Sequence, residues 1–138
     1  MKHEITTAWA GGMAFESDIF GHKLRMDSSK EGGGEDSGCR PKPLLLASVA
    51  GCSGMDVVSI LNKMRQALSW FDIKVEAEAT EGQPSYYSSM EMVYRFKESD
   101  KLDEDKVKRA VELSHEKYCG VSALFKMAIP VTWRIEYC

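Results

Sequence analysis

The feature that most constrains this chain is an apolar segment, rich in small residues, from Leu44 to Leu61. Its apolar positions are too dense for a helix with a single buried stripe, and a helix that is apolar nearly all round is buried. Pro43 suits a first helical turn, where the missing N–H costs no hydrogen bond. We therefore predict a core helix over 44–61, buried on most sides, whose polar end emerges at Asn62.

The segments on either side of this helix predict strands and two further helices. Apolar residues alternate with polar ones over 4–10, 13–19, 24–26, 72–80, 90–97 and 131–137, which is typical of half-buried strands. Asp103 is a good N-cap for a helix that runs to about Tyr118, and a shorter helix follows over 121–128. The predicted order is βββ-α-ββ-α-α-β, an α+β fold in which antiparallel sheets pack on the long central helix. We expect one domain over 1–138.

Residues 27–40 form a polar, glycine-rich stretch with nothing to bury. We predict a mobile loop there. The Gly32-Gly33-Gly34 run lacks the lysine and serine of a phosphate-binding loop and does not lead directly into a helix, so a flexible loop is the favoured interpretation.

Composition and charge exclude several classes of partner. The net charge is −3 and no basic stripe alternates with aromatic residues, which argues against nucleic-acid binding. The N-terminus has no apolar leader, and polar residues interrupt the longest apolar run, so we expect neither secretion nor a membrane span. A cytoplasmic location follows as the default, with the four cysteines as free thiols. No cysteine or histidine spacing indicates a metal site, and no cofactor is expected.

Two cysteines are candidates for chemistry. Cys52 lies inside the core helix among small residues, and the nearby Gly51 and Gly54 suggest that something approaches the backbone closely. Taken alone, Cys52 is more often an inert core residue. Cys119 falls at the break between two helices, where a helix N-terminus can stabilise a thiolate, although a plain capping role is equally consistent. His115 lies one turn before Cys119, but the favoured reading of its segment is a charged surface.

Two blocks of sequence are distinctive when they occur together. One runs from Pro41 to Leu61 and reads PKPLLLASVAGCSGMDVVSIL; the other runs from Ala110 to Ser122 and reads AVELSHEKYCGVS. Together they resemble the OsmC/Ohr superfamily, most closely its OsmC-like, YhfA-type branch. The resemblance covers essentially the whole chain.

This resemblance implies an intertwined homodimer with central helices wrapped by sheets of both subunits. It also implies reduction of peroxides, organic hydroperoxides especially, as part of oxidative-stress defence. Cys52 matches the peroxidatic cysteine and Cys119 the resolving cysteine, with an external dithiol as reductant. Cys52 would need a nearby cation to hold it as a thiolate, since a free thiol is mostly protonated at neutral pH.

One departure from the family pattern keeps an alternative open. Characterised peroxidases of the superfamily carry a glutamate shortly after the proline that starts the helix, whereas this chain has Pro43 followed by Leu44. That glutamate orients an arginine over the reactive sulfur. Arg25, Arg40 and Lys42 are the candidates here to stabilise the thiolate. The alternative function is a non-catalytic dimer that binds a small apolar ligand.

Overall fold

The computed structural model describes all 138 residues, which group into two compact units, 1–45 and 46–138. Each unit has its own sheet, and each is described by itself below. The prediction of one domain over the whole chain stays a prediction.

The first unit is built on a three-stranded antiparallel meander, as the alternation predicts. Its strands are β1 (Thr6–Trp9), β2 (Phe15–Ile19) and β3 (His22–Met26), hydrogen-bonded in the order β1-β2-β3. Gly21, in the tight turn between the last two strands, has a φ of +87°, a conformation that glycine adopts without strain.

After β3 the chain folds around a buried carboxylate. The Asp27 side chain accepts hydrogen bonds from the backbone N–H groups of Ser28, Glu35 and Ser37, and from the Ser37 hydroxyl at 2.6 Å. The Ser37 hydroxyl and these N–H groups lower the pKa of Asp27 to about 2. The glycine-rich loop thus has a defined anchor, and its mobility stays a prediction.

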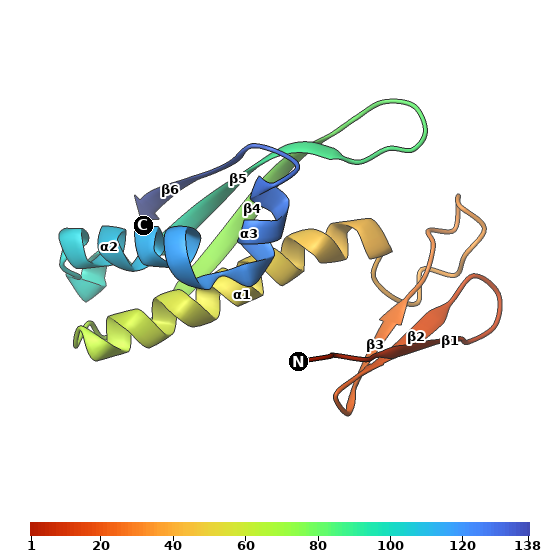
Figure 1. The fold of residues 1–138 in the computed structure, drawn as a ribbon, viewed down its shortest axis with the longest axis horizontal. Helices are drawn as coiled ribbons and strands as arrows, with labels where there is room; N and C mark the ends of the chain where they lie inside the picture. The colour runs from red at the N-terminus through yellow and green to blue at the C-terminus, as the bar shows by residue number, and fades with distance from the viewer. The chain divides into compact units, whose positions relative to one another are not determined.

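The second unit places helices on one face of a three-stranded sheet (Figure 1). The sheet consists of β4 (Phe71–Ala79), β5 (Tyr87–Phe96) and β6 (Val131–Tyr137), in that order. Its helices are α1 (Pro41–Lys63, whose first turn belongs to the first unit), α2 (Glu104–Leu113) and α3 (Gly120–Lys126). A short 3₁₀ turn, η1 (Glu98–Asp100), precedes α2, and a π-helical turn, η2 (Ser114–Tyr118), follows it.

The strand directions correct one prediction. β4 and β5 are antiparallel, but β6 runs parallel to β5, with Tyr94 opposite Ile135. The expectation of purely antiparallel sheets is therefore wrong for the second unit. The reason is the long connection through α2, η2 and α3, which returns the chain to the end of the sheet where β5 began.

The core of the second unit lies between the sheet and the helices. Alternate residues of β5 point toward the helices and meet the buried stripe of α1 and that of α2. The fully buried members of this core include Val49, Val57, Leu61, Met92, Tyr94, Phe96, Val107, Ala110 and Val111. Burying apolar area on this scale is the main stabilisation of the unit.

Helix α1 differs from its prediction in length and in burial. It begins at Pro41 rather than at 44 and ends at Lys63. Only Val49, Ser53, Val57 and Leu61 are buried in this chain, a stripe with the helical spacing of four residues. The expectation of burial on most sides is therefore wrong for the single chain, because the sheet covers only one face of the helix.

The opposite face of α1 is apolar and exposed. Met55 retains 76% of its accessible surface and Val58 retains 37%. By length and composition, the helix could cross a membrane, which the sequence argument had excluded. Core helices of water-soluble domains meet the same criterion, so the feature alone assigns no membrane location.

Candidate functional site

The structure brings the Cys52 and Cys119 thiols together in the second unit. Cys52 lies mid-way along α1 and is partly buried, and the Cys119 side chain is near enough to raise the pKa of its thiol. The Val121 backbone N–H donates a hydrogen bond to the Cys52 sulfur. The two residues are 67 positions apart in the sequence, and both are free thiols. Two neighbouring thiols are the arrangement from which a disulfide can form.

Cys119 is the N-cap of α3. Its side-chain sulfur accepts a hydrogen bond from the Ser122 backbone N–H at 3.3 Å, while its own N–H donates to the Ser114 carbonyl at 2.8 Å. Only 3% of its surface is exposed. The π-helical turn that precedes it presents the residue to α1 at this position.

The surroundings of Cys52 favour its neutral thiol form. Desolvation by burial raises the pKa of Cys52, and the neighbouring Cys119 thiol and Asp56 carboxylate raise it further. The Val121 N–H acts in the opposite direction, since a donor stabilises a thiolate. Activation of this sulfur as a nucleophile therefore requires positive charge beyond these groups.

Gly51 and Gly54, which flank Cys52, have different environments. A Cβ at Gly54 would lie 3.4 Å from the Ile73 side chain, so this residue meets the sheet at ordinary contact distance. A Cβ at Gly51 would meet nothing in this chain. Neither environment within this chain requires a glycine, so the close approach that the glycines suggest stays a prediction.

A chain of buried side-chain hydrogen bonds lies next to the thiols. The Ser53 hydroxyl is 2.5 Å from the Tyr94 hydroxyl and 2.8 Å from the Ser114 hydroxyl. Tyr94 contacts His115 Nε2 at 2.6 Å, and Ser114 donates to Asp56 Oδ2 at 2.9 Å. Four of these five side chains are at most 6% exposed, and Asp56 is half-buried. We refer to these five residues as the polar chain.

Burial sets the protonation of the two ring side chains of the polar chain. Desolvation raises the pKa of Tyr94 well above its usual value, so its hydroxyl keeps its proton. Desolvation, helped by the Lys126 ammonium, lowers the pKa of His115 to about 4. Lys126 donates to the His115 carbonyl, and the His115 ring stacks on Trp133 with a centroid distance of 6.0 Å. The imidazole is therefore neutral at pH 7.

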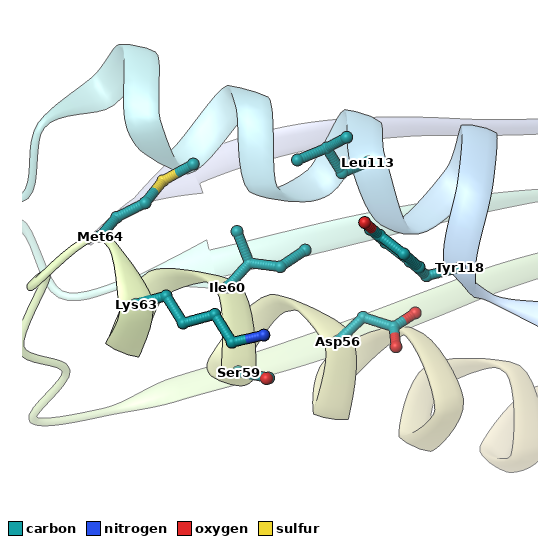
Figure 2. A pocket seen from close by; sticks show the side chains of 7 residues that line it. All are labelled: Asp56, Ser59, Ile60, Lys63, Met64, Leu113 and Tyr118. Carbon is teal, nitrogen blue, oxygen red and sulfur yellow. The ribbon is translucent and has the colours of Figure 1, made fainter.

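A pocket opens between α1 and the α2–η2 segment (Figure 2). It encloses about 400 Å³. Its lining combines an apolar wall with a carboxylate, an ammonium and two hydroxyl groups: Asp56, Ser59, Ile60, Lys63, Met64, Leu113 and Tyr118. Asp56 belongs both to this pocket and to the polar chain, and its charge acts on Cys52. Asp56 is thus the residue that the pocket shares with the surroundings of Cys52, and neither cysteine lines the pocket.

The structure places the other sequence candidates in the first unit. Arg25 donates to the Ser37 hydroxyl at 2.9 Å and lies 3.7 Å from the Glu16 carboxylate. Arg40 pairs with Asp36 at 2.8 Å. Lys42 lies in the first turn of α1. None of the three is among the groups that shift the pKa of Cys52.

The two remaining cysteines are exposed and lie outside the thiol pair. Cys39 donates to the Arg25 carbonyl at 3.4 Å, and Cys138 is the last residue of the chain. No group of three or more histidine, cysteine, aspartate or glutamate side chains in residues 1–138 could hold a metal ion.

Sequence reasoning missed most of the polar chain and misplaced His115. The segment 114–117 was expected to form a charged surface, but Ser114 and His115 are buried and only Glu116 and Lys117 are exposed. The cause is the π-helical turn, which turns Ser114 and His115 toward the sheet. One signal was available, because Ser53 and Asp56 are polar residues in the most apolar segment of the chain.

Comparisons with known proteins agree with this arrangement. Residues 33–134 match the family described as OsmC-like protein. The chain belongs to the OsmC-like family. It is 33% identical to protein YhfA of Escherichia coli K12 over 129 residues, which cover 93% of this chain and 92% of YhfA.

Solved structures share the same fold. A hypothetical protein from Aquifex aeolicus VF5 superposes with a TM-score of 0.83 at 30% identity, covering 100% of this chain and 99% of that one. A protein described as an organic hydroperoxide resistance protein OsmC, from Legionella pneumophila, gives a TM-score of 0.70 at 16% identity, covering 99% and 97%. At that identity the second likeness concerns the fold. The mixed α+β fold is thus that of OsmC-like proteins.

Proposed function

We propose that this protein is a thiol-dependent peroxide reductase that uses Cys52 and Cys119 as its redox pair, with organic hydroperoxides as substrates. The observation that carries the proposal is that the fold makes neighbours of the Cys52 and Cys119 thiols, which are far apart in sequence. Membership of a family that includes organic hydroperoxide resistance proteins supports it.

The proposed cycle has three balanced steps. The Cys52 sulfur attacks one peroxide oxygen, the O–O bond breaks, and the thiol proton leaves with the alcohol, so that Cys52 becomes a sulfenic acid. Cys119 then attacks the Cys52 sulfur, which forms a disulfide and releases water. An external dithiol reduces this disulfide by exchange and is itself oxidised to a disulfide. The wall formed by Ile60, Met64 and Leu113 suits the alkyl part of such a peroxide.

Activation of Cys52 requires a cation near its sulfur. The pKa of Cys52 is raised, and the causes of the shift are burial, Val121, Cys119 and Asp56, none of which is a cation. Arg25, Arg40 and Lys42 stay the proposed sources of this charge. Replacing the responsible residue with glutamine should move the pH profile of Cys52 alkylation to higher pH.

A homodimer in the cytoplasm is part of the proposal. The exposed apolar face of α1, with Met55 and Val58, is a surface that a second copy can cover. Sedimentation at micromolar concentration should give twice the chain mass of 15.5 kDa. A monomer under these conditions would contradict this part of the proposal.

The deciding experiment counts thiols after one equivalent of cumene hydroperoxide. Wild type should lose two thiols rapidly, with a Cys52–Cys119 disulfide in the peptide map. Cys119→Ser should accumulate a sulfenic acid that dimedone traps, and Cys52→Ser should not react. The double variant Cys39→Ser/Cys138→Ser is the matched control and should behave as wild type. Consumption no faster than that of free cysteine would reject the peroxidase.

A second function is favoured by the raised pKa of Cys52 together with the pocket. In that case the protein is a non-catalytic OsmC-like dimer, and the pocket holds a small apolar ligand. Slow thiol consumption combined with saturable binding of an apolar fluorescent probe, reduced by Leu113→Asp, would support this function over the first.

A further inference from the structure

The donor and acceptor roles along the polar chain can be assigned by starting from Asp56, the carboxylate at one end. A carboxylate oxygen only accepts, so the single proton of Ser114 goes to Asp56. Ser114 must then accept from Ser53 at 2.8 Å, which commits the proton of Ser53. Ser53 must in turn accept from Tyr94 at 2.5 Å. The Tyr94 oxygen is left as an acceptor, and His115 Nε2 must donate to it.

This direction defines the tautomer of His115. The ring is neutral at pH 7 because desolvation lowers its pKa to about 4. A neutral imidazole carries one proton, and the polar chain places that proton on Nε2. The structure thus contains a continuous row of donors from His115 to Asp56. The Tyr94 hydroxyl also lies 3.9 Å from the Met92 sulfur, a longer and weaker contact than the 2.5 Å to Ser53.

The middle of the polar chain joins the two segments that carry the thiols. Ser53 follows Cys52 directly on α1. Ser114 opens the π-helical turn, and its carbonyl accepts the Cys119 N–H at 2.8 Å. The hydrogen bond between the Ser53 and Ser114 hydroxyls therefore links the Cys52 turn to the Cys119 backbone.

We propose that the polar chain is a positioning device for the thiol pair: the one-way row of hydroxyl protons fixes the Ser53–Ser114 hydrogen bond and thereby holds the Cys52 and Cys119 segments side by side. Ser53, Ser114, Tyr94 and His115 are positioning residues in this proposal. Its redox consequence rests on the function proposed above, namely that Cys52 and Cys119 form a disulfide. Holding the sulfurs together raises the effective concentration of one thiol toward the other.

The test measures that effective concentration in the full chain by equilibrating the Cys52–Cys119 pair with reduced and oxidised glutathione. The variants form a double-mutant cycle: Ser53→Ala, Ser114→Ala and both together. Each single change should lower the effective concentration about 10-fold, the value of one buried hydrogen bond. The double change should lower it by no more than about 10-fold, because both remove the same link. Ser88→Ala, a serine whose hydroxyl donates to the Glu78 carbonyl on the edge of the sheet, is the matched control and should have no effect.

The proposal would be overturned if the two serine substitutions lowered the effective concentration independently of each other. A double variant reduced about 100-fold would show that the two hydroxyl groups act separately. Single variants with the effective concentration of wild type would show that they do not position the sulfurs at all.

A second measurement uses the wild-type protein, so its result does not depend on whether a destabilised variant folds. Long-range ¹H–¹⁵N correlation of the His115 ring at pH 7 should show a protonated Nε2 and an unprotonated Nδ1. A proton on Nδ1 would reverse the polar chain and overturn the assignment of donors.

Neither measurement uses a peroxide, so the outcomes separate the two proposals. If the protein fails to reduce cumene hydroperoxide but shows the expected double-mutant cycle and His115 tautomer, the positioning proposal stands and the peroxidase proposal fails. If the protein reduces the peroxide but the effects of Ser53→Ala and Ser114→Ala are additive, the peroxidase proposal stands and the positioning proposal fails.

Discussion

Both units contain an aspartate that accepts serine hydrogen bonds, but the two are satisfied in different ways. Asp27, in the first unit, receives three backbone N–H groups and one hydroxyl. Asp56, in the second unit, receives one hydroxyl, and that hydroxyl is the last of a row of side chains that ends at His115.

The difference concerns which residues each arrangement depends on. Backbone N–H groups are present whatever the side chains are, so the Asp27 anchor depends chiefly on Asp27 itself. The polar chain depends on every member, because a buried hydroxyl without its partner costs more than a hydrogen bond contributes. A carboxylate held by backbone N–H groups, like Asp27, can anchor a loop of varied sequence. A row of side-chain hydrogen bonds, like the polar chain, fixes one arrangement of a site.

The largest expected effect comes from breaking the polar chain at its centre. Ser53→Val should lower the free energy of unfolding by about 3 kcal/mol, because the Tyr94 hydroxyl loses its oxygen acceptor and keeps only the distant Met92 sulfur, and Ser114 loses a donor in the core. Urea denaturation monitored by tryptophan fluorescence measures this loss. Ser17→Val in the first unit is the matched control, since Ser17 is also buried but bonds only to Thr7. Its cost should be about 1 kcal/mol, and equal costs would remove the contrast between the units.

The next effect is a pH dependence that belongs to the second unit. His115 has a pKa of about 4 when folded, against an ordinary value of 6.5, so the unfolded chain binds more protons between these pH values. Stability is therefore complete above pH 6.5 and falls as the pH drops toward 4. The pKa difference corresponds to about 3 kcal/mol, and screening by solvent reduces the expected loss to about 2 kcal/mol.

The control for this pH dependence is His115→Gln, which keeps a donor toward Tyr94 without a titrating ring. The variant should lose much less stability between pH 6.5 and 4 than wild type does. Asp27 does not interfere, because its pKa of about 2 places its effect below this range. An unchanged slope in the variant would mean that His115 is not the group responsible.

The regular elements of both units could be predicted because they follow local rules. Alternation marked the strands, Asp103 marked the start of α2, and Pro43 marked the first turn of α1. The parallel pairing of β6 could not be read locally, since it depends on where the connection returns the chain. The exposed face of α1 was also missed, because composition does not say how many faces of an apolar helix the same chain covers.

The candidate site likewise contains residues that the sequence indicated and residues that only the three-dimensional fold brings together. The cysteine blocks indicated Cys52 and Cys119 through the family resemblance, and the structure makes the two thiols neighbours. Their partners were missed because Ser53, Tyr94 and Ser114 meet only in three dimensions, across 61 positions between the two serines. The π-helical turn that buries His115 has no sequence signature of its own.

A smaller and local effect is expected at the Asp27 anchor. Asp27→Asn leaves one oxygen to accept hydrogen bonds where the carboxylate has two, so the N–H groups of Glu35 and Ser37 should exchange with solvent faster. Amide hydrogen exchange of these two residues measures the change. The amides of the second unit should be unaffected, and a general increase in exchange would show that the anchor supports more than its own loop.

The smallest expected effect concerns a single thiol. Asp56→Asn removes a negative charge that raises the pKa of Cys52 but leaves an oxygen to accept from Ser114. The pKa of Cys52 should fall, and peptide-level quantification of iodoacetamide alkylation against pH should show a profile moved to lower pH. The thiol should still titrate above its ordinary value, because desolvation is the larger cause and the substitution does not change it. Glu112→Gln, a carboxylate on α2 that is not among the groups shifting Cys52, should leave the profile in place. An unmoved profile in Asp56→Asn would mean that the polar chain positions the thiols without acting on their charge.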